Sequence, residues 1–322
     1  MDEFELIRRY FTRELIDADV RIGIGDDGAV MRPTTGRDLV AVMDTLVEGV
    51  HFPVDLGAAD IGWRAVAVNL SDIAAMAATP RWMTLALTLR EANPDWLQDF
   101  SSGLFAAAEE HSISLVGGDT TRGQQNIISI QICGDVDPDF ILTRAGARVR
   151  DLICVSGTLG DAAAGLNLLQ SNSVMLDADN DLIRRFRRPN ARVSLAQTIA
   201  PHASAAIDIS DGLYGDIQKL LRASDTGGRI ELDSIPLSST LVEQFGLDRA
   251  QQFALGGGDD YELCFTLPAG SEALLSEFSQ QHTVRISCIG VVTDNHKLIC
   301  TRQGEPFNYV DQGYHHFGAS GS

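Results

Sequence analysis

Residues 39–45 of the chain read Leu-Val-Ala-Val-Met-Asp-Thr, a short apolar run that stops at a carboxylate. Apolar runs of this length are typical of buried strands. We therefore expect a strand over residues 39–43 with Asp44 at its end. An acid at the point where a buried strand emerges is a stronger sign of a binding site than an acid in a solvated turn.

Further acidic loops recur along the whole chain, most of them just after a short apolar run. They are residues 25–28 (Gly-Asp-Asp-Gly), 117–121 (Gly-Gly-Asp-Thr-Thr), 208–212 (Asp-Ile-Ser-Asp-Gly) and 257–262 (Gly-Gly-Asp-Asp-Tyr-Glu). Carboxylates that gather at strand ends repel one another, and burying them unpaired is costly. Hard divalent cations prefer oxygen ligands, so the pattern predicts a metal centre.

Some of these loops also have plainer interpretations. Gly and Asp favour turns, so residues 25–28 in isolation are read first as a solvated turn. Ser210 or Asp211 could cap the helix that follows, although a cap leaves Asp208 unexplained. In residues 117–121, two glycines allow the backbone to approach a ligand closely, and their N–H groups can cradle phosphate oxygens beside Asp119.

Asp72 stands on a predicted helix over residues 59–78, in surroundings too apolar for a solvated face. Asn69 lies three residues earlier, so both side chains can look the same way. A buried acid is expected to be paired or bound to metal; an acid on the helix surface is the alternative. His51 is a lone histidine, and its spacing alone favours a structural role.

The net charge of the chain limits the classes of molecule that it is expected to bind. Its 322 residues include 44 acidic and 25 basic residues, for a formal net charge of −19. Nucleic acid and anionic membranes both need a basic surface, so neither is expected as a partner. Lysine occurs only at Lys219 and Lys297, and the Gly-Lys-Ser/Thr of a P-loop does not occur. A phosphate-bearing substrate would therefore need intervening metal ions.

The lack of a visible secretory signal and the cysteine usage favour a cytoplasmic protein. The first residues, Met-Asp-Glu-Phe, lack the basic and apolar regions of a secretory signal. No apolar run is long enough to span a bilayer. Five cysteines occur without a Cys-x-x-Cys spacing, and we expect buried free thiols in a reducing compartment.

Helical and strand patterns alternate in both halves of the chain, which is typical of α/β folds. The length favours two domains, and a polar segment over residues 135–151 separates them, so we expect domains at 1–137 and 148–322. An opening helix should bury Phe4, Ile7 and Phe11. The remaining expected helices are 59–78, 93–111, 212–222 and 271–280, and the expected strands are 20–24, 39–43, 82–89, 114–116, 126–133, 152–156, 205–209, 261–267, 284–292 and 298–301.

The order of these motifs resembles the thiamine-monophosphate kinases, a family in the superfamily of aminoimidazole ribonucleotide synthetase. Each motif is modest, but the combination is highly specific, and the resemblance extends from the first helix to Phe317. The motifs that carry it are residues 23–29, 44–52, 67–76, 117–121, 142–147, 157–161, 208–212 and 260–263.

The resemblance implies a two-domain fold and an ATP-dependent reaction. The N-terminal α/β domain would bind metal and nucleotide, and its sheet would form a barrel with the sheet of a second subunit in a homodimer. The C-terminal α+β domain would fold over the nucleotide. The reaction would transfer the γ-phosphoryl group of ATP to thiamine monophosphate, with several Mg²⁺ ions, and give thiamine diphosphate.

The resemblance also implies roles for particular residues. The magnesium ligands would be Asp27, Asp44, Asp72, Asp119, Asp208 and Asp211. The residues that contact ATP would be Gly118, Asp119, Arg144 and Ser210. Those at the thiamine phosphate substrate would be His51, Glu262 and an aromatic residue near the C-terminus, for which Tyr314 is the first choice and Phe317 the second. The family often has hydroxyl residues where this chain has Val42-Met43, so backbone carbonyls would replace one side-chain ligand.

Such a reaction depends on the protein to position the substrates and to neutralise charge more than to supply covalent chemistry. A phosphate monoester has a second pKa near about 6, so the acceptor is already largely a dianion at neutral pH. We therefore expect direct in-line transfer without a phosphoenzyme or an essential general base. Arg144 could add a fixed positive charge with bidentate geometry.

Two other classes of function compete with this one. Another ATP-dependent enzyme of the superfamily, similar to aminoimidazole ribonucleotide synthetase, is the nearest, and residues 44–52 argue against it. Selenophosphate synthetase needs a reactive cysteine or selenocysteine and a lysine that are absent before Asp26, and the hydrogenase-maturation relative ends in a functional cysteine that is absent here. The second class is a non-catalytic acidic metal-binding module, although the separated acids lack the compact spacing of an EF-hand loop.

Overall fold

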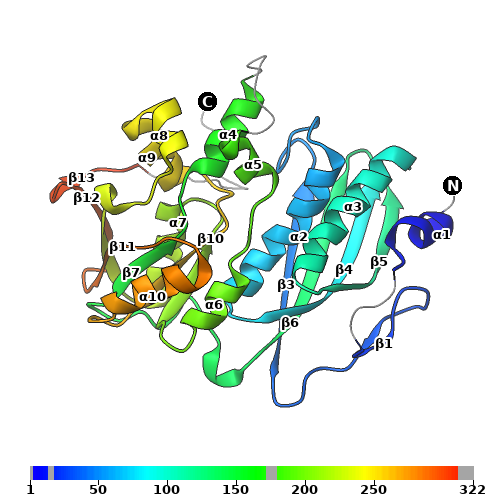
Figure 1. Cartoon of the computed structure of the whole chain (residues 1–322), viewed down its shortest axis with the longest axis horizontal. Helices are drawn as coiled ribbons and strands as arrows, with labels where there is room; N and C mark the ends of the chain where they lie inside the picture. Colours follow the sequence, from blue (N-terminus) through cyan, green and yellow to red (C-terminus); the bar gives the residue numbers. More distant parts are fainter. Residues whose placement is uncertain (1–2, 14–17, 172–179, 311–322) are drawn as a thin grey trace. The chain divides into compact units, whose positions relative to one another are not determined.

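The computed structural model describes residues 3–13, 18–171 and 180–310. The chain divides into two compact units, residues 1–141 and 142–322, and each is described by itself. Both units contain a sheet with helices, so the expected mixture of α/β and α+β elements is confirmed (Figure 1). None of the described helices has the length and apolar character needed to cross a membrane.

Unit 1 is built on a four-stranded sheet in the order β3-β6-β4-β5. Only β4 and β5 run parallel, and the helix α3 connects them. The elements of the sheet and its helices are β3 (Asp38–Val47), α2 (Ala58–Ala75), β4 (Thr79–Leu89), α3 (Pro94–Glu110), β5 (Ser114–Arg122) and β6 (Ile127–Val136). They are preceded by α1 (Glu3–Leu6), a π-helical turn (Ile7–Phe11) and the short strands β1 (Val20–Ile22) and β2 (Val30–Met31).

The helices α2 and α3 lie side by side on one face of this sheet (Figure 1). Two glycines allow their close crossing, because a Cβ on Gly62 would lie 2.2 Å from the Phe100 carbonyl oxygen and one on Gly103 would lie 1.8 Å from that of Ala59. Asn93 caps α3 by accepting hydrogen bonds from the N–H groups of Asp95 (3.0 Å) and Trp96 (3.2 Å).

Unit 2 contains a seven-stranded sheet in the order β13-β12-β9-β11-β7-β10-β8. Every neighbouring pair is antiparallel except β12 with β9. The strands are β7 (Leu152–Ser156), β8 (Ala205–Ile209), β9 (Gly227–Glu231), β10 (Glu262–Leu267), β11 (Ile286–Thr293), β12 (Leu298–Arg302) and β13 (Glu305–Phe307). The helices are α4 (Asp161–Gln170), α5 (Asp181–Arg187), α6 (Val193–Ile199), α7 (Leu213–Ala223), α8 (Ser239–Phe245), α9 (Leu247–Gly256) and α10 (Glu272–His282), with a 3₁₀ turn at Leu232–Ser234. Another 3₁₀ turn, Pro138–Phe140, lies at the end of unit 1.

The largest errors in the predicted strand ends are at β3 and β5. The strand β3 continues past Asp44 to Val47, because antiparallel pairing with β6 runs on to the pair Val47 and Ile127. Likewise β5 continues past Asp119 to Arg122, because its parallel pairing with β4 is maintained that far. Both acids therefore lie within strands and not at their ends.

The opening helix is also different from its prediction. It is a four-residue α-helix followed by the π-helical turn, and the side chains that it buries are Leu6, Tyr10 and Phe11. Phe4 is 80% exposed. The wider π turn shifts the buried face away from the positions that a regular 3.6-residue period predicts.

Candidate active site

The first predicted site residue, Asp44, is held at the junction of β3 and α2. Its backbone N–H donates to Oδ1 of Asn69 at 3.0 Å, and Asn69 Nδ2 donates to the Ala65 carbonyl oxygen at 3.0 Å. Asn69 is fully buried on α2; its hydrogen bond to Ala65 is buried and its hydrogen bond from Asp44 is partly buried. Asp72 follows three residues later on the same side of α2 and is partly exposed. Asn69 thus fixes the backbone of Asp44. Asp72 projects on the same side of the sheet.

The strand register assigns Asp119 to the opposite face of the sheet. Asp44 pairs with Ile130, whose side chain is buried on the helix-covered face. The next row contains Thr45, which contacts Ser129 at 2.8 Å between hydroxyl oxygens, and Asp119 lies in this row. Because successive side chains of a strand alternate between faces, Asp119 points to the face without helices. Gly118 is required beside it, since a Cβ there would lie 1.9 Å from the Leu85 carbonyl oxygen.

His51 follows β3 in a tight turn. Its Nδ1 accepts a hydrogen bond from the Val47 N–H at 3.0 Å, so a neutral ring carries its hydrogen on Nε2, a donor suited to a phosphate oxygen. Glu48 secures the same turn, because its buried carboxylate accepts from Arg90 Nη2 at 2.8 Å. Asp27 lies in the exposed loop after β1, where its N–H donates to Asp26 Oδ1 at 2.8 Å.

In unit 2 the predicted acidic turn joins β8 to α7. Asp208 is buried at the end of β8. The N–H groups of Ser210 and Asp211 donate to Oδ2 of Asp216 at 2.9 and 3.0 Å. The residue before α7 is Gly212, and neither Ser210 nor Asp211 caps the helix with its side chain, so the capping alternative is wrong. Instead, Asp216 reaches back from α7 and organises the turn.

Lys219, one of the two lysines of the chain, neutralises this turn. Its Nζ donates to Asp211 Oδ2 at 2.6 Å and to Asp216 Oδ1 at 2.8 Å. Burial raises the pKa of Asp216, and Lys219 opposes that shift. A cation that binds Oδ2 of Asp211 would therefore compete with Lys219 for that oxygen.

A glycine-rich segment packs directly against the acidic turn. The N–H groups of Asp259 and Tyr261 donate to the carbonyl oxygens of Ser210 (2.9 Å) and Ile209 (2.8 Å). Asp259 and Tyr261 both have left-handed backbone conformations, with φ of 70° and 50°. Such conformations are uncommon outside glycine and cluster at functional sites.

Gly258→Ala is expected to lower the free energy of unfolding by about 1–3 kcal/mol. The reason is steric, because the added Cβ would lie 2.3 Å from the carbonyl oxygen of Ser210. Urea denaturation measures the change. The matched control is Gly215→Ala in α7, where nothing lies within 4 Å of the added carbon, and the better helix propensity of alanine leaves stability unchanged or slightly raised. Equal losses in both variants would contradict the packing argument.

Glu262, a predicted substrate residue, is 0% exposed at the start of β10. Its carboxylate accepts four hydrogen bonds: from Ser156 Oγ (2.6 Å), Arg185 Nη2 (2.8 Å), Arg192 Nε (2.7 Å) and Arg192 Nη2 (2.5 Å). Burial alone would raise the pKa of Glu262, but the two arginines outweigh it and lower the pKa to about 2. A carboxylate offers about four acceptor sites, and all are used within unit 2.

Asp260 lies beside this cluster and is also buried. Its Oδ2 accepts from the Gly160 N–H at 2.8 Å, whereas Oδ1 has no hydrogen-bond partner among the residues that the structure describes. Burial raises the pKa of Asp260 well above its usual value, against the opposing effects of the Gly160 N–H and Arg185. Besides Glu262 and Asp260, the buried Asp161 also acts on the Arg185 guanidinium through its charge.

The remaining predicted residues are less constrained. Arg144 is exposed in the segment after unit 1, where its carbonyl oxygen accepts from Ser224 Oγ at 3.0 Å. Tyr314, and its alternative Phe317, lie outside the described residues. Within the described ranges, no group of three or more His, Cys, Asp or Glu is arranged to hold a metal ion. The predicted magnesium ligands are divided between the two units, so the magnesium assignment stays a prediction.

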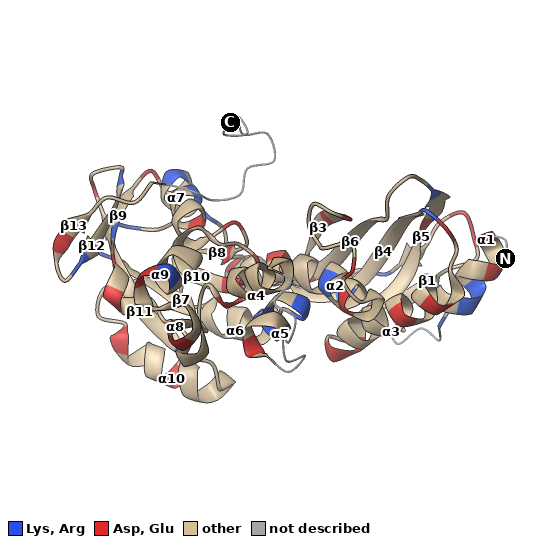
Figure 2. Ribbon diagram, turned by 90° about the horizontal axis from the view of Figure 1, so that it is seen from above, with Lys and Arg blue, Asp and Glu red and all other residues tan. Residues whose placement is uncertain are grey.

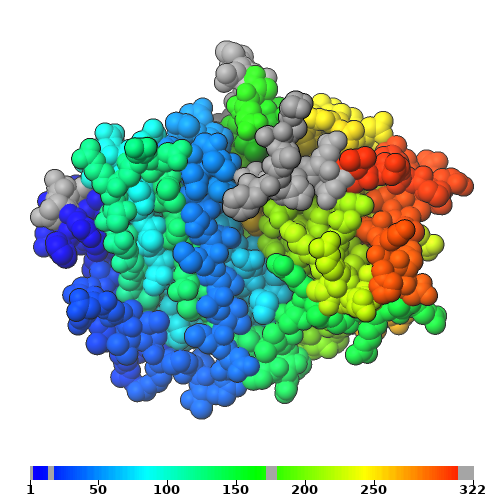
Figure 3. Space-filling model, turned by 180° about the vertical axis from the view of Figure 1, so that it is seen from behind, coloured from blue at the N-terminus to red at the C-terminus, as the bar shows by residue number. Residues whose placement is uncertain are grey.

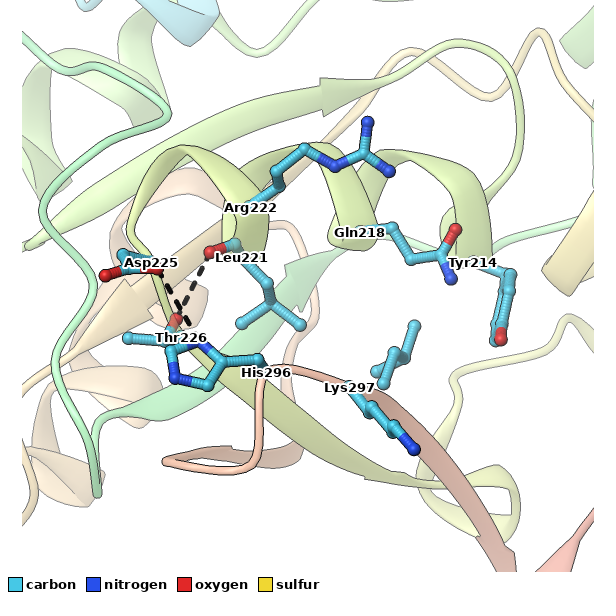
Figure 4. Close-up of a pocket in the computed structure, with 9 residues that line it drawn as sticks. Tyr214, Gln218, Leu221, Arg222, Asp225, Thr226, His296 and Lys297 are labelled. Carbon is cyan, nitrogen blue, oxygen red and sulfur yellow. Dashed lines mark hydrogen bonds and ion pairs between the residues drawn. The ribbon is translucent and has the colours of Figure 1, made fainter.

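A cavity of about 420 Å³ opens beside α7 but contains none of the predicted site residues (Figure 4). Tyr214, Gln218 and Leu221 line it from α7, and His296 and Lys297 line it from the loop before β12. Figure 4 shows Arg222 and Lys297 pointing away from each other. The basic groups therefore do not converge on one ligand.

Several residues that organise these sites were not predicted: Asp216, Lys219, Arg185, Arg192 and Ser156. Lys219 had a local signal, since Asp216 and Lys219 are three residues apart on a helix and can pair. Arginines also cluster at residues 184–192, and those of α5 are drawn in blue in Figure 2. Their partner Glu262 is far along the chain, so no local pattern connects them. Asn69 was recognised only as a neighbour of Asp72.

Comparisons with known proteins agree with this arrangement. The N-terminal domain of the AIR synthase related proteins matches residues 25–136, and their C-terminal domain matches residues 149–302. The thiamine-monophosphate kinase of Escherichia coli (strain K12) is 44% identical over 319 residues, which cover 98% of each chain.

Solved structures of related proteins are also similar to this chain. The thiamine-monophosphate kinase from Stenotrophomonas maltophilia K279a is 43% identical and superposes with a TM-score of 0.87, covering 95% of this chain and 98% of its own. A structure described as AaThiL complexed with AMPPCP and TMP is 31% identical with a TM-score of 0.78, covering 98% of this chain and 96% of its own.

Proposed function

The chain belongs to the AIR synthase related family, and we propose that within it the protein is a thiamine-monophosphate kinase, which transfers the γ-phosphoryl group of ATP to thiamine monophosphate and forms thiamine diphosphate and ADP. The observation that carries this function is the 44% identity to the Escherichia coli enzyme over 98% of both chains. The bound AMPPCP and TMP of the related AaThiL structure support ATP as the phosphoryl donor and thiamine monophosphate as the acceptor.

We infer that the enzyme uses magnesium. The candidate ligands offer only carboxylate oxygens, the donor type that this ion prefers, and they are Asp27, Asp44, Asp72, Asp119, Asp208 and Asp211. When bound, Mg²⁺ would neutralise phosphate oxygens that the acidic chain would otherwise repel. Asn69 and Asp216 would hold the backbone of Asp44 and of the turn at residues 210–211 in place.

The nucleotide and acceptor would be positioned by other groups. Gly118 and Ser210 would contact ATP with Asp119, and Arg144 would supply a bidentate positive charge. His51 would donate from Nε2 to the acceptor phosphate. No general base is needed, because the acceptor phosphate is largely a dianion at neutral pH, and the phosphoryl group would pass directly between the two substrates.

Glu262 would serve the acceptor site together with its arginines. Its hydrogen bonds to Ser156, Arg185 and Arg192 fill the carboxylate in the described structure. In the proposed role, Glu262 orients these guanidinium groups, whose remaining N–H groups complement an anionic substrate. The C-terminal aromatic residue Tyr314 would cover the thiamine rings.

We also propose a homodimer formed through the sheet of unit 1. The face opposite α2 and α3 exposes Leu39 by 56% and Met43 by 60%. Among the described residues no helix covers this face, although β1 and β2 pack over its Trp82 end (Figure 3). Pairing this face with that of a second copy would close a barrel and bury these apolar side chains. The substrates and the free cysteines fit a cytoplasmic enzyme.

Phosphorus NMR of the protein with ATP, Mg²⁺ and thiamine monophosphate tests the function. New diphosphate resonances alongside ADP are expected. ADP formation that requires a substrate of aminoimidazole ribonucleotide synthetase instead would favour the other superfamily activity. Metal binding without ATP and without ADP production would indicate the non-catalytic module.

His51→Ala is expected to raise the KM for thiamine monophosphate by about tenfold or more, with a smaller change in kcat. The reason is the loss of one hydrogen bond to a charged group, worth about 1.5–3 kcal/mol. Steady-state kinetics at saturating ATP measure the effect, with the exposed His296→Ala as control. A fall in kcat with an unchanged KM would show that His51 does not act by binding the acceptor.

A further inference from the structure

We propose that Cys154 and Cys288 form an oxidisable dithiol site that closes to a disulfide between β7 and β11. The proposal does not depend on the proposed kinase function. It concerns two residues at the centre of the seven-stranded sheet, and their strands are direct neighbours in that sheet.

The strand register places the two cysteines directly opposite each other. Cys288 pairs with Cys154 in the antiparallel ladder of β11 and β7. Opposed residues of an antiparallel pair have Cα atoms about 4.5–5.5 Å apart, within the range of about 4.4–6.8 Å that disulfides require. No other cysteine among the described residues stands opposite a cysteine: Cys264 pairs with Val155 and Ile207, Cys300 with Phe307 and Ile230, and Cys133 with Ala41 and Trp82.

The environment gives the two sulfurs different roles. Cys154 is fully buried, whereas Cys288 is half-buried and lines a cavity of about 700 Å³ together with Gly290 and Thr301. The hydrogen bond from the Cys154 thiol, the largest effect, lowers the pKa of Cys288 to about 6, although burial opposes it. Cys288 is thus the accessible nucleophile, and Cys154 is the resolving thiol beside it.

The chemistry needs hydrogen peroxide as oxidant. The Cys288 thiolate attacks a peroxide oxygen, so a sulfur–oxygen bond forms, the oxygen–oxygen bond breaks, and the released hydroxide takes up a proton to become water. The Cys154 sulfur then attacks the sulfenic sulfur of Cys288, forming the sulfur–sulfur bond and expelling a second water. Two thiols are oxidised, one peroxide is reduced, and a dithiol reductant reverses the result.

The test uses the full-length protein, treated with hydrogen peroxide or with a reductant, then unfolded and alkylated. Peptide mapping without reduction is expected to show one cross-linked pair containing Cys154 and Cys288, with both thiols protected from alkylation. Cys133, Cys264 and Cys300 are expected to stay alkylated. Reductant should restore both protected thiols.

Two variants test which cysteines the cross-link requires. Cys288→Ser is expected to abolish the protection of Cys154, while Cys133→Ser, in unit 1, leaves the cross-link unchanged. The wild-type peptide map stands by itself if Cys288→Ser fails to fold. Oxidation of Cys288 to a sulfinic acid with Cys154 still alkylated, or a cross-link that involves another cysteine, would overturn the proposal.

Discussion

Asp44→Ala is expected to lower kcat/KM by about a thousand-fold. Removing one group that stabilises developing charge in an active site costs about 10²–10³-fold, and a metal ligand in an acidic phosphotransferase site belongs to this class. The backbone of Asp44 is fixed by its hydrogen bond to Asn69 at 3.0 Å. The loss is therefore expected in the reaction rate and not in the folding of β3.

The measurement is steady-state kinetics across a magnesium titration, with a thermal melt of each variant. Asp38→Ala is the matched control, because Asp38 is an exposed acid at the start of the same strand and belongs to no proposed site. Asp119→Ala is expected to cause a loss of similar size from the opposite face of the sheet. A near-normal rate for Asp44→Ala at modest magnesium would remove Asp44 from the ligand set.

The sequence predicted the elements whose signals are local. Periodicity identified α2, and Asn93-Pro94, a typical cap and first turn, identified the start of α3. The buried apolar runs gave β7 and β8 with the bounds that the structure has. The predicted strand ends were less accurate where an acidic residue was assumed to end the strand. A carboxylate side chain does not interrupt backbone pairing with the next strand.

Features that depend on distant partners could not be predicted. Which face of the sheet carries Asp44 or Asp119 follows from pairing with β6 and β4, which no single segment encodes. The pairing of Glu262 with Arg185 and Arg192 joins residues at least 70 positions apart. Sequence motifs therefore supplied the candidate acids, and the structure showed the partners of Glu262 and Asp211 and of the backbone of Asp44.

Glu262→Ala is expected to destabilise the protein by about 3–5 kcal/mol, the usual cost of removing one partner of a buried ion pair. The loss arises because Arg185 and Arg192 would keep their charge with no carboxylate to accept from them. Urea denaturation measures it, with the exposed Glu243→Ala in α8 as control. Arg192→Ala in the Glu262→Ala background should then cost far less than in the wild type, since the pair is already broken.

The acid limb of the stability curve provides an independent test. The pKa of Glu262 is lowered from 4.5 to about 2, so its contribution to stability is complete above the unfolded value and is lost as the pH falls through that window. Glu262→Gln cannot titrate, and its stability should change less than that of the wild type between pH 4.5 and about 2. If both proteins lose stability equally there, and Glu262→Ala costs less than about 1 kcal/mol, the arginines do not depend on this carboxylate. Glu262 would then have to act on the substrate itself, and its removal would raise the KM for thiamine monophosphate without weakening the fold.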